Sequence, residues 1–134
     1  MRMPTRTFRL TRERLVAYAA ASGDHNPIHW SETRAAAVGL PGVIAHGMLS
    51  MGLAATAVTQ WAEQEHVGAH VVEYATRFTR PVLVPDTADG VKLTVDGVVG
   101  DVREDGTVRV DLTVRCAGQK VLARTRAVLA PARV

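Results

Sequence analysis

The stretch from Gly47 to Gln64 constrains the fold of this chain more than any other. It reads GMLSMGLAATAVTQWAEQ, and its first three turns carry almost no polar side chain, whereas its end is amphipathic. The spacing predicts a helix, and a helix that is apolar on all sides has to be enclosed by protein. The run is too short and too interrupted to span a bilayer. We therefore expect one buried central helix and no membrane association.

The chain that follows this helix changes its periodicity from that of a helix to that of strands. Residues 107–116 and 120–130 alternate apolar and polar side chains, which is typical of half-buried strands. Residues 90–102 also indicate a strand, and residues 71–84 alternate less regularly because Pro81 interrupts them. Turns are expected at Asp105–Gly106 and Gly118–Gln119. This part of the chain predicts an antiparallel meander.

The chain that precedes the central helix predicts one strand and two shorter helices. Residues 7–11 alternate as a short strand, and residues 11–22 follow as a helix that Thr11 caps and Gly23 ends. A second helix is expected from Ser31, its N-cap, to just before Gly39. The whole order predicts an α+β domain whose antiparallel sheet wraps around the long central helix, which is the hotdog architecture.

Length and cysteine content indicate a single domain in a reducing compartment. A chain of 134 residues can bury a core without disulfides or metals, so we expect one domain over residues 1–134. Cys116 is the single cysteine, which excludes an internal disulfide. The N-terminal residues include no apolar segment of the kind found in signal peptides. A cytoplasmic protein is therefore expected.

The net charge of +3 leaves nucleic acid an unfavoured partner. Lys92 and Lys120 are the only lysines, and the many arginines are scattered through the expected strands instead of forming one patch. A scattered positive charge remains compatible with an acidic partner such as a phosphorylated cofactor or an acidic carrier protein.

The stretch SGDHNPIHW, from Ser22 to Trp30, gathers an acid and two histidines around a proline. Pro27 restricts the residue before it to extended geometry and so stiffens the turn. A rigid turn could hold Asp24 and His29 within reach of one reacting atom, as an acid–base pair requires. Asp24 and Asn26 are also ordinary turn formers, and the spacing on its own favours that simpler interpretation.

A metal site is the third interpretation of the same stretch. Asp24, His25 and His29 are all ligand types, but Pro27 prevents the two histidines from sharing a helical face. The remaining histidines, His46, His66 and His70, follow at irregular spacing. We therefore expect no metal.

A second stretch, AHGMLSMG at residues 45–52, stands where the central helix begins. The first backbone N–H groups of a helix have no partner within it, and the helix dipole places positive charge there. At Gly47 such a donor could hold a carbonyl oxygen that gains negative charge. Gly47 could equally serve only to let two elements pack tightly.

Taken together, SGDHNPIHW and GLPGVIAHGMLSMG resemble the signature of the MaoC-like, (R)-specific enoyl-thioester hydratase family, and the likeness extends over most of the chain. The resemblance implies that Asp24 and His29 are catalytic, that the Gly47 N–H binds the thioester oxygen, and that Asn26 and Pro27 support the loop. His25 falls on a variable position. The chain departs from many members at Ser31, where they have an aspartate, and from some at Ala55, where they have a serine.

The resemblance also implies an activity and an assembly. The activity is the reversible hydration of trans-2-enoyl thioesters to (3R)-3-hydroxyacyl thioesters in fatty-acid metabolism, on CoA or acyl carrier protein and without a cofactor. The assembly is a dimer, either of two copies or with a related hotdog subunit, because the likeness is strongest to catalytic B-type subunits of two-subunit dehydratases. A hotdog subunit that binds acyl thioesters without turnover and a hotdog thioesterase remain alternatives.

Overall fold

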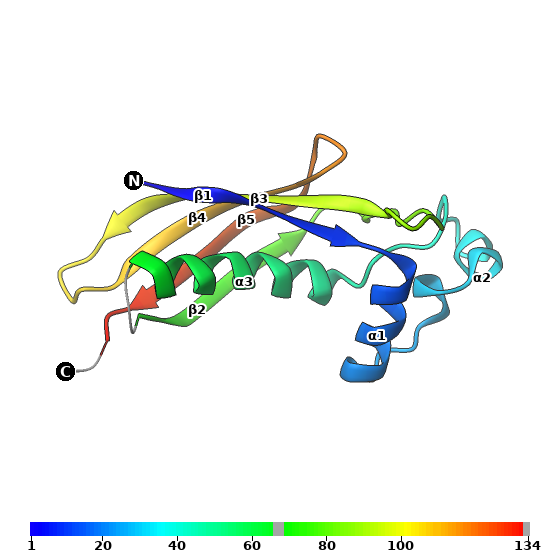
Figure 1. Ribbon diagram of the computed structural model, residues 1–134, viewed down its shortest axis with the longest axis horizontal. Coiled ribbons are helices and arrows are strands. Elements are labelled where there is room, and N and C mark those ends of the chain that lie inside the picture. The colour runs from blue at the N-terminus through cyan, green and yellow to red at the C-terminus, as the bar shows by residue number, and fades with distance from the viewer. Residues whose placement is uncertain (66–68, 133–134) are drawn as a thin grey trace.

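The computed structural model describes residues 1–65 and 69–132. Its elements, in chain order, are β1 (Arg2–Leu10), α1 (Arg12–Ser22), the 3₁₀ turn η1 (Pro27–His29), α2 (Glu32–Ala37), α3 (Gly47–Glu65), β2 (His70–Phe78), β3 (Val91–Val102), β4 (Val108–Cys116) and β5 (Gln119–Ala130). Figure 1 shows α3 lying along one face of the sheet, with α1 and α2 beyond the end at which α3 begins. The predicted α+β arrangement is therefore present.

The five strands form one antiparallel sheet in the order β1-β3-β4-β5-β2. The three C-terminal strands follow one another as a meander, as their period-two patterns predicted. β1 and β2 flank the meander, so these two strands are the edges of the sheet within one chain. The inward side chains of β3, β4 and β5 form the core together with α3, and they include Leu93, Val95, Val110, Val114 and Ala127.

The central helix is enclosed on one side only. Leu53, Ala54, Ala57, Val58 and Trp61 are buried against the sheet. Met48, in contrast, is 60% exposed, and the expectation of a helix enclosed all round was therefore wrong for the single chain. The physical reason is that a single sheet can cover only one face of a helix.

Local capping signals placed the shorter helices correctly. The Thr11 side chain accepts a hydrogen bond from the Arg14 N–H at the start of α1, and Gly23 ends that helix with a left-handed φ of 77°. The Ser31 hydroxyl accepts from the Arg34 N–H in the same way at the start of α2. These caps fix the point at which the chain leaves α1 and the point at which it enters α2, and thereby both ends of the segment between the two helices.

Several boundaries differ from their predictions, and β2 ends at Phe78 instead of continuing past Pro81 to residue 84 because proline lacks the N–H for strand pairing. β1 begins at Arg2 rather than residue 7, and its pairing with β3 shifts register between Met3 and Arg6. Pro4 lies within that shift, and an edge strand accommodates a proline at such an irregularity. The turn between β4 and β5 is centred on Ala117–Gly118, one residue earlier than predicted, since both have left-handed φ values of 52° and 76°.

A short extended segment, residues 43–45, leads from the loop after α2 to the start of α3. Its backbone pairs with residues 82–84, because Ala45 N donates to Val82 O at 2.8 Å and Val84 N donates to Val43 O at 3.0 Å. The Arg12 side chain donates to the carbonyl of Val84 and also pairs with Glu32. α1, α2 and the loop before β3 are thereby tied around the start of α3.

None of the helices within residues 1–65 and 69–132 is long and apolar enough to cross a membrane.

Candidate active site

The turn from Ser22 to Trp30 is held by side-chain bonds to its own backbone. The Asn26 N–H donates to Asp24 Oδ1 at 3.1 Å, and the Ile28 N–H donates to Asn26 Oδ1 at 3.2 Å, which caps η1. Pro27 occupies the first position of η1, where its missing N–H costs nothing. Asn26 and Pro27 thus lie where a bracing role needs them.

His29 is buried and its protonation pattern is set by a backbone carbonyl. Its Nδ1 lies 2.7 Å from the carbonyl oxygen of Ile44, and the Ile44 N–H donates to Ile28 O at 3.1 Å. A carbonyl only accepts, so Nδ1 carries the hydrogen, and in the neutral ring Nε2 carries the lone pair. This pair of bonds aims an unprotonated Nε2 at Asp24.

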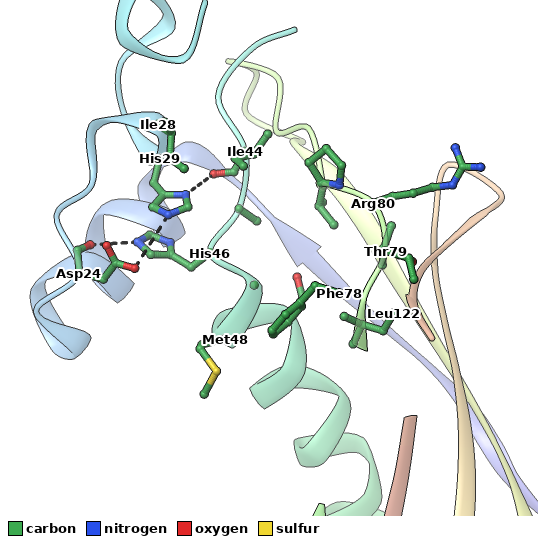
Figure 2. A pocket seen from close by; sticks show the side chains of 16 residues that line it. Asp24, Ile28, His29, Ile44, His46, Met48, Phe78, Thr79, Arg80 and Leu122 are labelled. Atoms are coloured by element: carbon green, nitrogen blue, oxygen red, sulfur yellow. Dashed lines mark hydrogen bonds and ion pairs between the residues drawn. The ribbon is translucent and has the colours of Figure 1, made fainter. Parts of the chain in front are cut away.

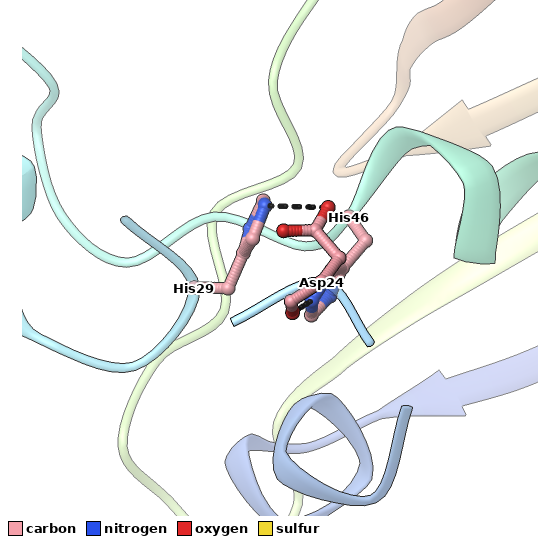
Figure 3. Close-up of side chains that lie close together, drawn as sticks. All are labelled: Asp24, His29 and His46. Atoms are coloured by element: carbon pink, nitrogen blue, oxygen red, sulfur yellow. Dashed lines mark hydrogen bonds and ion pairs between the residues drawn. The ribbon is translucent and has the colours of Figure 1, made fainter. Parts of the chain in front are cut away.

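The structure brings Asp24 and His29 together as the sequence predicted. Asp24 Oδ2 lies 3.9 Å from His29 Nε2, and the carboxylate is 52% exposed while the imidazole is 8% exposed. The distance is too long for a direct hydrogen bond. It suits one water molecule that bonds to both groups. Figure 3 shows the carboxylate and the imidazole edge facing one another.

A third side chain, His46, completes this cluster, and sequence reasoning did not include it. Its ring stacks on His29 with centroids 3.7 Å apart and planes inclined by 22°, and its Nε2 lies 3.1 Å from the main-chain oxygen of Asp24. Burial lowers the pKa of His46 below its ordinary value. The available signal was a histidine in the otherwise apolar segment GVIAHG, directly before the central helix.

The same three residues raise the question of a metal, because their ligand atoms all lie within 4.8 Å of one another. His29 Nδ1 and His46 Nε2 are bonded to carbonyl oxygens, which leaves His29 Nε2 and His46 Nδ1 as ligands. An ion bonded to an imidazole lies in the plane of the ring. Two rings stacked 3.7 Å apart cannot both meet that condition. The donor set therefore fits a metal ion poorly.

Gly47, the first residue of α3, faces both the pocket and an aromatic ring. Its N–H has no hydrogen-bond partner in the part of the chain that the structure describes, as expected at a helix start. A Cβ on Gly47 would lie 2.9 Å from Cε1 of Phe78. Both interpretations of Gly47 therefore have structural support: a free donor and a close approach between two elements.

These groups line a pocket of about 470 Å³ (Figure 2). Asp24, His29 and His46 lie on one side of it, and Phe78, Thr79 and Arg80 lie across from them. Ser50, one turn into α3, also lines the pocket, and its hydroxyl is buried with no partner among the described residues. The pocket is thus lined by an acid–base pair, by the start of α3 and by a wall of apolar side chains.

The remaining residues named from the sequence lie outside the cluster. His25 is exposed, and its carbonyl accepts from the Trp30 indole at 3.0 Å. Ser31 caps α2, and Ala55 is not among the residues that line the pocket. His70 is exposed at the start of β2, and His66 lies outside the described residues.

Comparison with known proteins identifies relatives of this architecture. A family model described as "MaoC like domain" matches residues 2–116. A 3-hydroxyacyl-thioester dehydratase X from Mycobacterium tuberculosis is 42% identical over 85 residues, which is 63% of this chain and 28% of that protein. An (R)-specific enoyl-CoA hydratase from Rhodospirillum rubrum is 34% identical over 116 residues, which is 87% of this chain and 76% of that protein.

Solved structures confirm the predicted hotdog fold. An R-hydratase, PhaJ1 from Pseudomonas aeruginosa, matches with a TM-score of 0.78 and 30% identity over 99% of this chain and 81% of that chain. The ChsH1–ChsH2 complex from Mycobacterium tuberculosis matches at 0.81 and 20% identity over 99% and 96%, which is a likeness of fold alone. The chain spans about a quarter of the length of the mycobacterial dehydratase that it matches.

Proposed function

Because the chain belongs to the MaoC-like domain family, we propose that it catalyses the reversible hydration of trans-2-enoyl thioesters to (3R)-3-hydroxyacyl thioesters. The observation that carries this proposal is the separation of 3.9 Å between Asp24 Oδ2 and His29 Nε2, beside the free N–H of Gly47 in one pocket. The pair suits a water molecule, and the helix start suits the oxygen of a thioester. Both requirements of the reaction are met within one site.

The reaction needs no oxidant and no group carrier beyond the thioester. In hydration, the water oxygen bonds to C3, one O–H bond of water and the C2=C3 π bond break, and C2 gains a proton. The proton that water loses balances the proton that C2 gains, so the acid–base pair only has to hold it between the two events. Dehydration runs through the same steps in reverse.

Asp24 and His29 are the proposed acid–base pair. The unprotonated Nε2 of His29 can take a proton from a water molecule, and the Asp24 carboxylate can accept a hydrogen bond from the same molecule and orient it. Either group can return the proton to C2. Asn26 and Pro27 are proposed to keep the carboxylate at this distance by fixing the turn.

Gly47 is the proposed electrostatic element of the site. The C2 position of a thioester exchanges protons readily only when negative charge on the thioester oxygen is stabilised. The unpartnered N–H of Gly47 and the positive end of the α3 dipole can stabilise that charge. Ala55 does not line the pocket, so its lack of a hydroxyl does not bear on this role.

The test is hydration of crotonyl-CoA, followed by loss of the enoyl absorbance. Asp24→Asn and His29→Ala should each lower the rate on the order of 10²–10⁴-fold. His25→Ala is the matched control in the same turn, and it should keep the wild-type rate because its side chain is exposed. Near-normal hydration by both Asp24→Asn and His29→Ala would refute the assignment.

The same assay separates the two alternative functions. Release of free thiol without a change at the double bond would indicate a thioesterase. Binding of the thioester without either change would indicate a subunit that binds substrate but does not convert it. A panel of enoyl-CoA and enoyl-carrier-protein substrates of increasing length would then identify the carrier and the acyl chain.

The chain is also proposed to act as a dimer in the cytoplasm. β2 is an unpaired edge in the single chain, and Val72, Phe78 and the neighbouring Met48 of α3 are 54%, 56% and 60% exposed. Exposed apolar side chains beside an open edge support a partner there. The partner is either a second copy or a related hotdog subunit, and the ChsH1–ChsH2 likeness supports considering the second.

A further inference from the structure

We propose that His46 is a positioning residue of this site, which as a neutral imidazole fixes the main chain of Asp24 and the ring of His29 relative to the first turn of α3. The inference rests on the proposed function, since it gives His46 a part in the reaction assigned to Asp24 and His29. His46 itself would exchange no proton with the substrate.

His46 contacts each component of the site by a different group. Its Nε2 lies 3.1 Å from the main-chain oxygen of Asp24, and its ring stacks on His29 at 3.7 Å. Its own carbonyl accepts from the N–H groups of Leu49 and Ser50, at 3.1 and 3.3 Å, and so begins α3. Gly47 is its neighbour in the chain. One residue thus links the acid–base pair to the proposed oxyanion donor.

The bond to Asp24 fixes the tautomer of His46. A main-chain carbonyl only accepts, so Nε2 carries the hydrogen, and Nδ1 of the neutral ring carries the lone pair. Nδ1 is buried and without a hydrogen-bond partner across residues 1–65 and 69–132. A proton on Nδ1 would therefore create a buried cation whose second N–H has no acceptor, which is unfavourable.

The groups packed around His46 favour the same neutral form. The ring of Tyr18 in α1 packs edge-on against the His46 ring, with the two centroids 4.8 Å apart, and the His29 ring is stacked on the His46 ring. A positive charge on His46 would therefore oppose any charge on His29. The Asp24 carboxylate is the one acid in the cluster, and it is half exposed. Burial is the largest influence and lowers the pKa of His46. The ring is thus suited to donate a hydrogen bond and not to transfer a proton.

The main chain of Asp24 depends on the hydrogen bond from His46 more than the neighbouring residues of the turn do. Residues 22–26 are all exposed, and the other bonds of the Asp24 main chain and carboxylate within the described chain join residues two positions away. The bond from His46 is the long-range hydrogen bond that ties the Asp24 main chain to the start of α3. Without it, the carboxylate would be held only by its own turn. A shift of about 1 Å in such a group can cost about 10²-fold in rate.

Two substitutions separate the hydrogen bond from simple filling of space. His46→Phe keeps a flat ring in the buried position but removes the donor, and His46→Gln keeps a donor without the ring. We expect His46→Phe to lower kcat roughly 10–100-fold with little change in KM. His46→Gln should recover several-fold of that loss. Tyr18→Phe is the matched control, because it keeps the edge contact with His46 and does not line the pocket, and its kcat should be unchanged.

Several outcomes would overturn the proposal. A folded His46→Phe protein with wild-type kcat would do so, and so would a His46→Gln protein no more active than His46→Phe. If His46→Phe does not fold, His46→Met supplies the donor-free comparison against His46→Gln. If, instead, the wild type hydrates no enoyl thioester, it is the proposed function that fails.

A measurement without substrate tests the neutral tautomer directly. In ¹⁵N spectra of histidine-labelled protein at about pH 7.5, His46 should show a protonated Nε2 and an unprotonated Nδ1. A His46 ring that carries its proton on Nδ1, or on both nitrogens, at that pH would overturn the proposal whatever the activity of the protein.

Discussion

At the scale of single residues, Gly47 has to meet two structural requirements. Its N–H is the proposed donor to the thioester oxygen, and the ring of Phe78 lies where a Cβ would project. Both requirements fall on an exposed position, since Gly47 is exposed and Phe78 beside it is 56% exposed. A donor at this position gains from the positive end of the α3 dipole.

We expect Gly47→Ala to lower kcat/KM on the order of 10²-fold, since the new Cβ would meet Phe78 at 2.9 Å and displace the donor. Gly52→Ala is the control on the same helix, because nothing lies within 4 Å of its added Cβ. It should keep activity and gain about 0.5–1 kcal/mol in the free energy of unfolding. Steady-state kinetics measures the activity of the two variants, and urea denaturation measures their free energy of unfolding. A fully active Gly47→Ala protein would show that the Phe78 ring moves aside and that the absence of a side chain at Gly47 is not needed for activity.

His46 also makes stability depend on pH. Its folded pKa lies below the unfolded value near 6.5, so the unfolded chain binds the proton more readily. The stability contributed by neutral His46 is complete above that value and falls as the pH drops below it, by at most ~1.4 kcal/mol per pH unit. Urea denaturation of the wild type and of His46→Phe between about pH 7.5 and about pH 5.5 measures this. An equal decline in both proteins would contradict the prediction.

The sequence was informative about Asp24 and His29 but not about His46. The first two lie five residues apart in a turn that Pro27 stiffens, so their proximity follows from local geometry. His46 meets Asp24 across 22 positions, because Ile44 bonds to Ile28 and His29 and because residues 43–45 pair with residues 82–84. No local pattern encodes such a pairing, and the histidine is visible only as an oddity in an apolar segment.

At the scale of elements, Gly90 shows how closely β1 and β3 are joined. It precedes β3 with a left-handed φ of 57°, and a Cβ there would lie 1.9 Å from the carbonyl oxygen of Leu10, the last residue of β1. Backbone cannot give way as a flexible side chain can. The residue therefore sets the point at which the two strands begin to pair, directly before α1.

We expect Gly90→Ala to lower the free energy of unfolding by more than about 3 kcal/mol, since the strained φ and the clash with backbone add together. Gly39→Ala is the matched control, because Gly39 has a φ of 85° but nothing within 4 Å of the added Cβ. It should cost only about 1–2 kcal/mol for the strained φ. Chemical denaturation of both variants provides the comparison, and equal losses would show that the contact with Leu10 is unimportant.

Elements with strong local signals were predicted closely, whereas long-range pairing was not. Thr11 and Ser31 mark helix starts because their side chains cap them, and Gly23 marks a helix end because its backbone adopts a left-handed φ. Each lies at the boundary that the sequence predicted. The extension of β1 back to Arg2 depends on pairing with β3 some ninety residues later. Edge pairing around Pro4 leaves no periodic signature, so the sequence indicated only the second half of that strand.

At the scale of the whole molecule, the open face of α3 and the edge strand β2 lie on the same side of the pocket. Phe78, at the end of β2, contacts Gly47, and both line the pocket. Met48 lines it as well and is 60% exposed. A partner on this edge would therefore cover apolar surface and close one wall of the site at the same time. The proposed assembly and the proposed activity are coupled through these residues.

This coupling predicts that breaking the edge contact also lowers activity. Val72→Asp places a charge on the exposed edge of β2, 54% exposed in the single chain, and should halve the mass measured by light scattering. Val38→Asp is the control, because Val38 follows α2 and is 67% exposed away from that edge, so its mass and activity should not change. The Val72→Asp monomer should lose activity in proportion to dissociation and regain it at higher protein concentration. A wild type that is already monomeric and inactive, and active with a related subunit, would identify the partner as that subunit. A wild-type monomer with full activity would show that this face needs no partner.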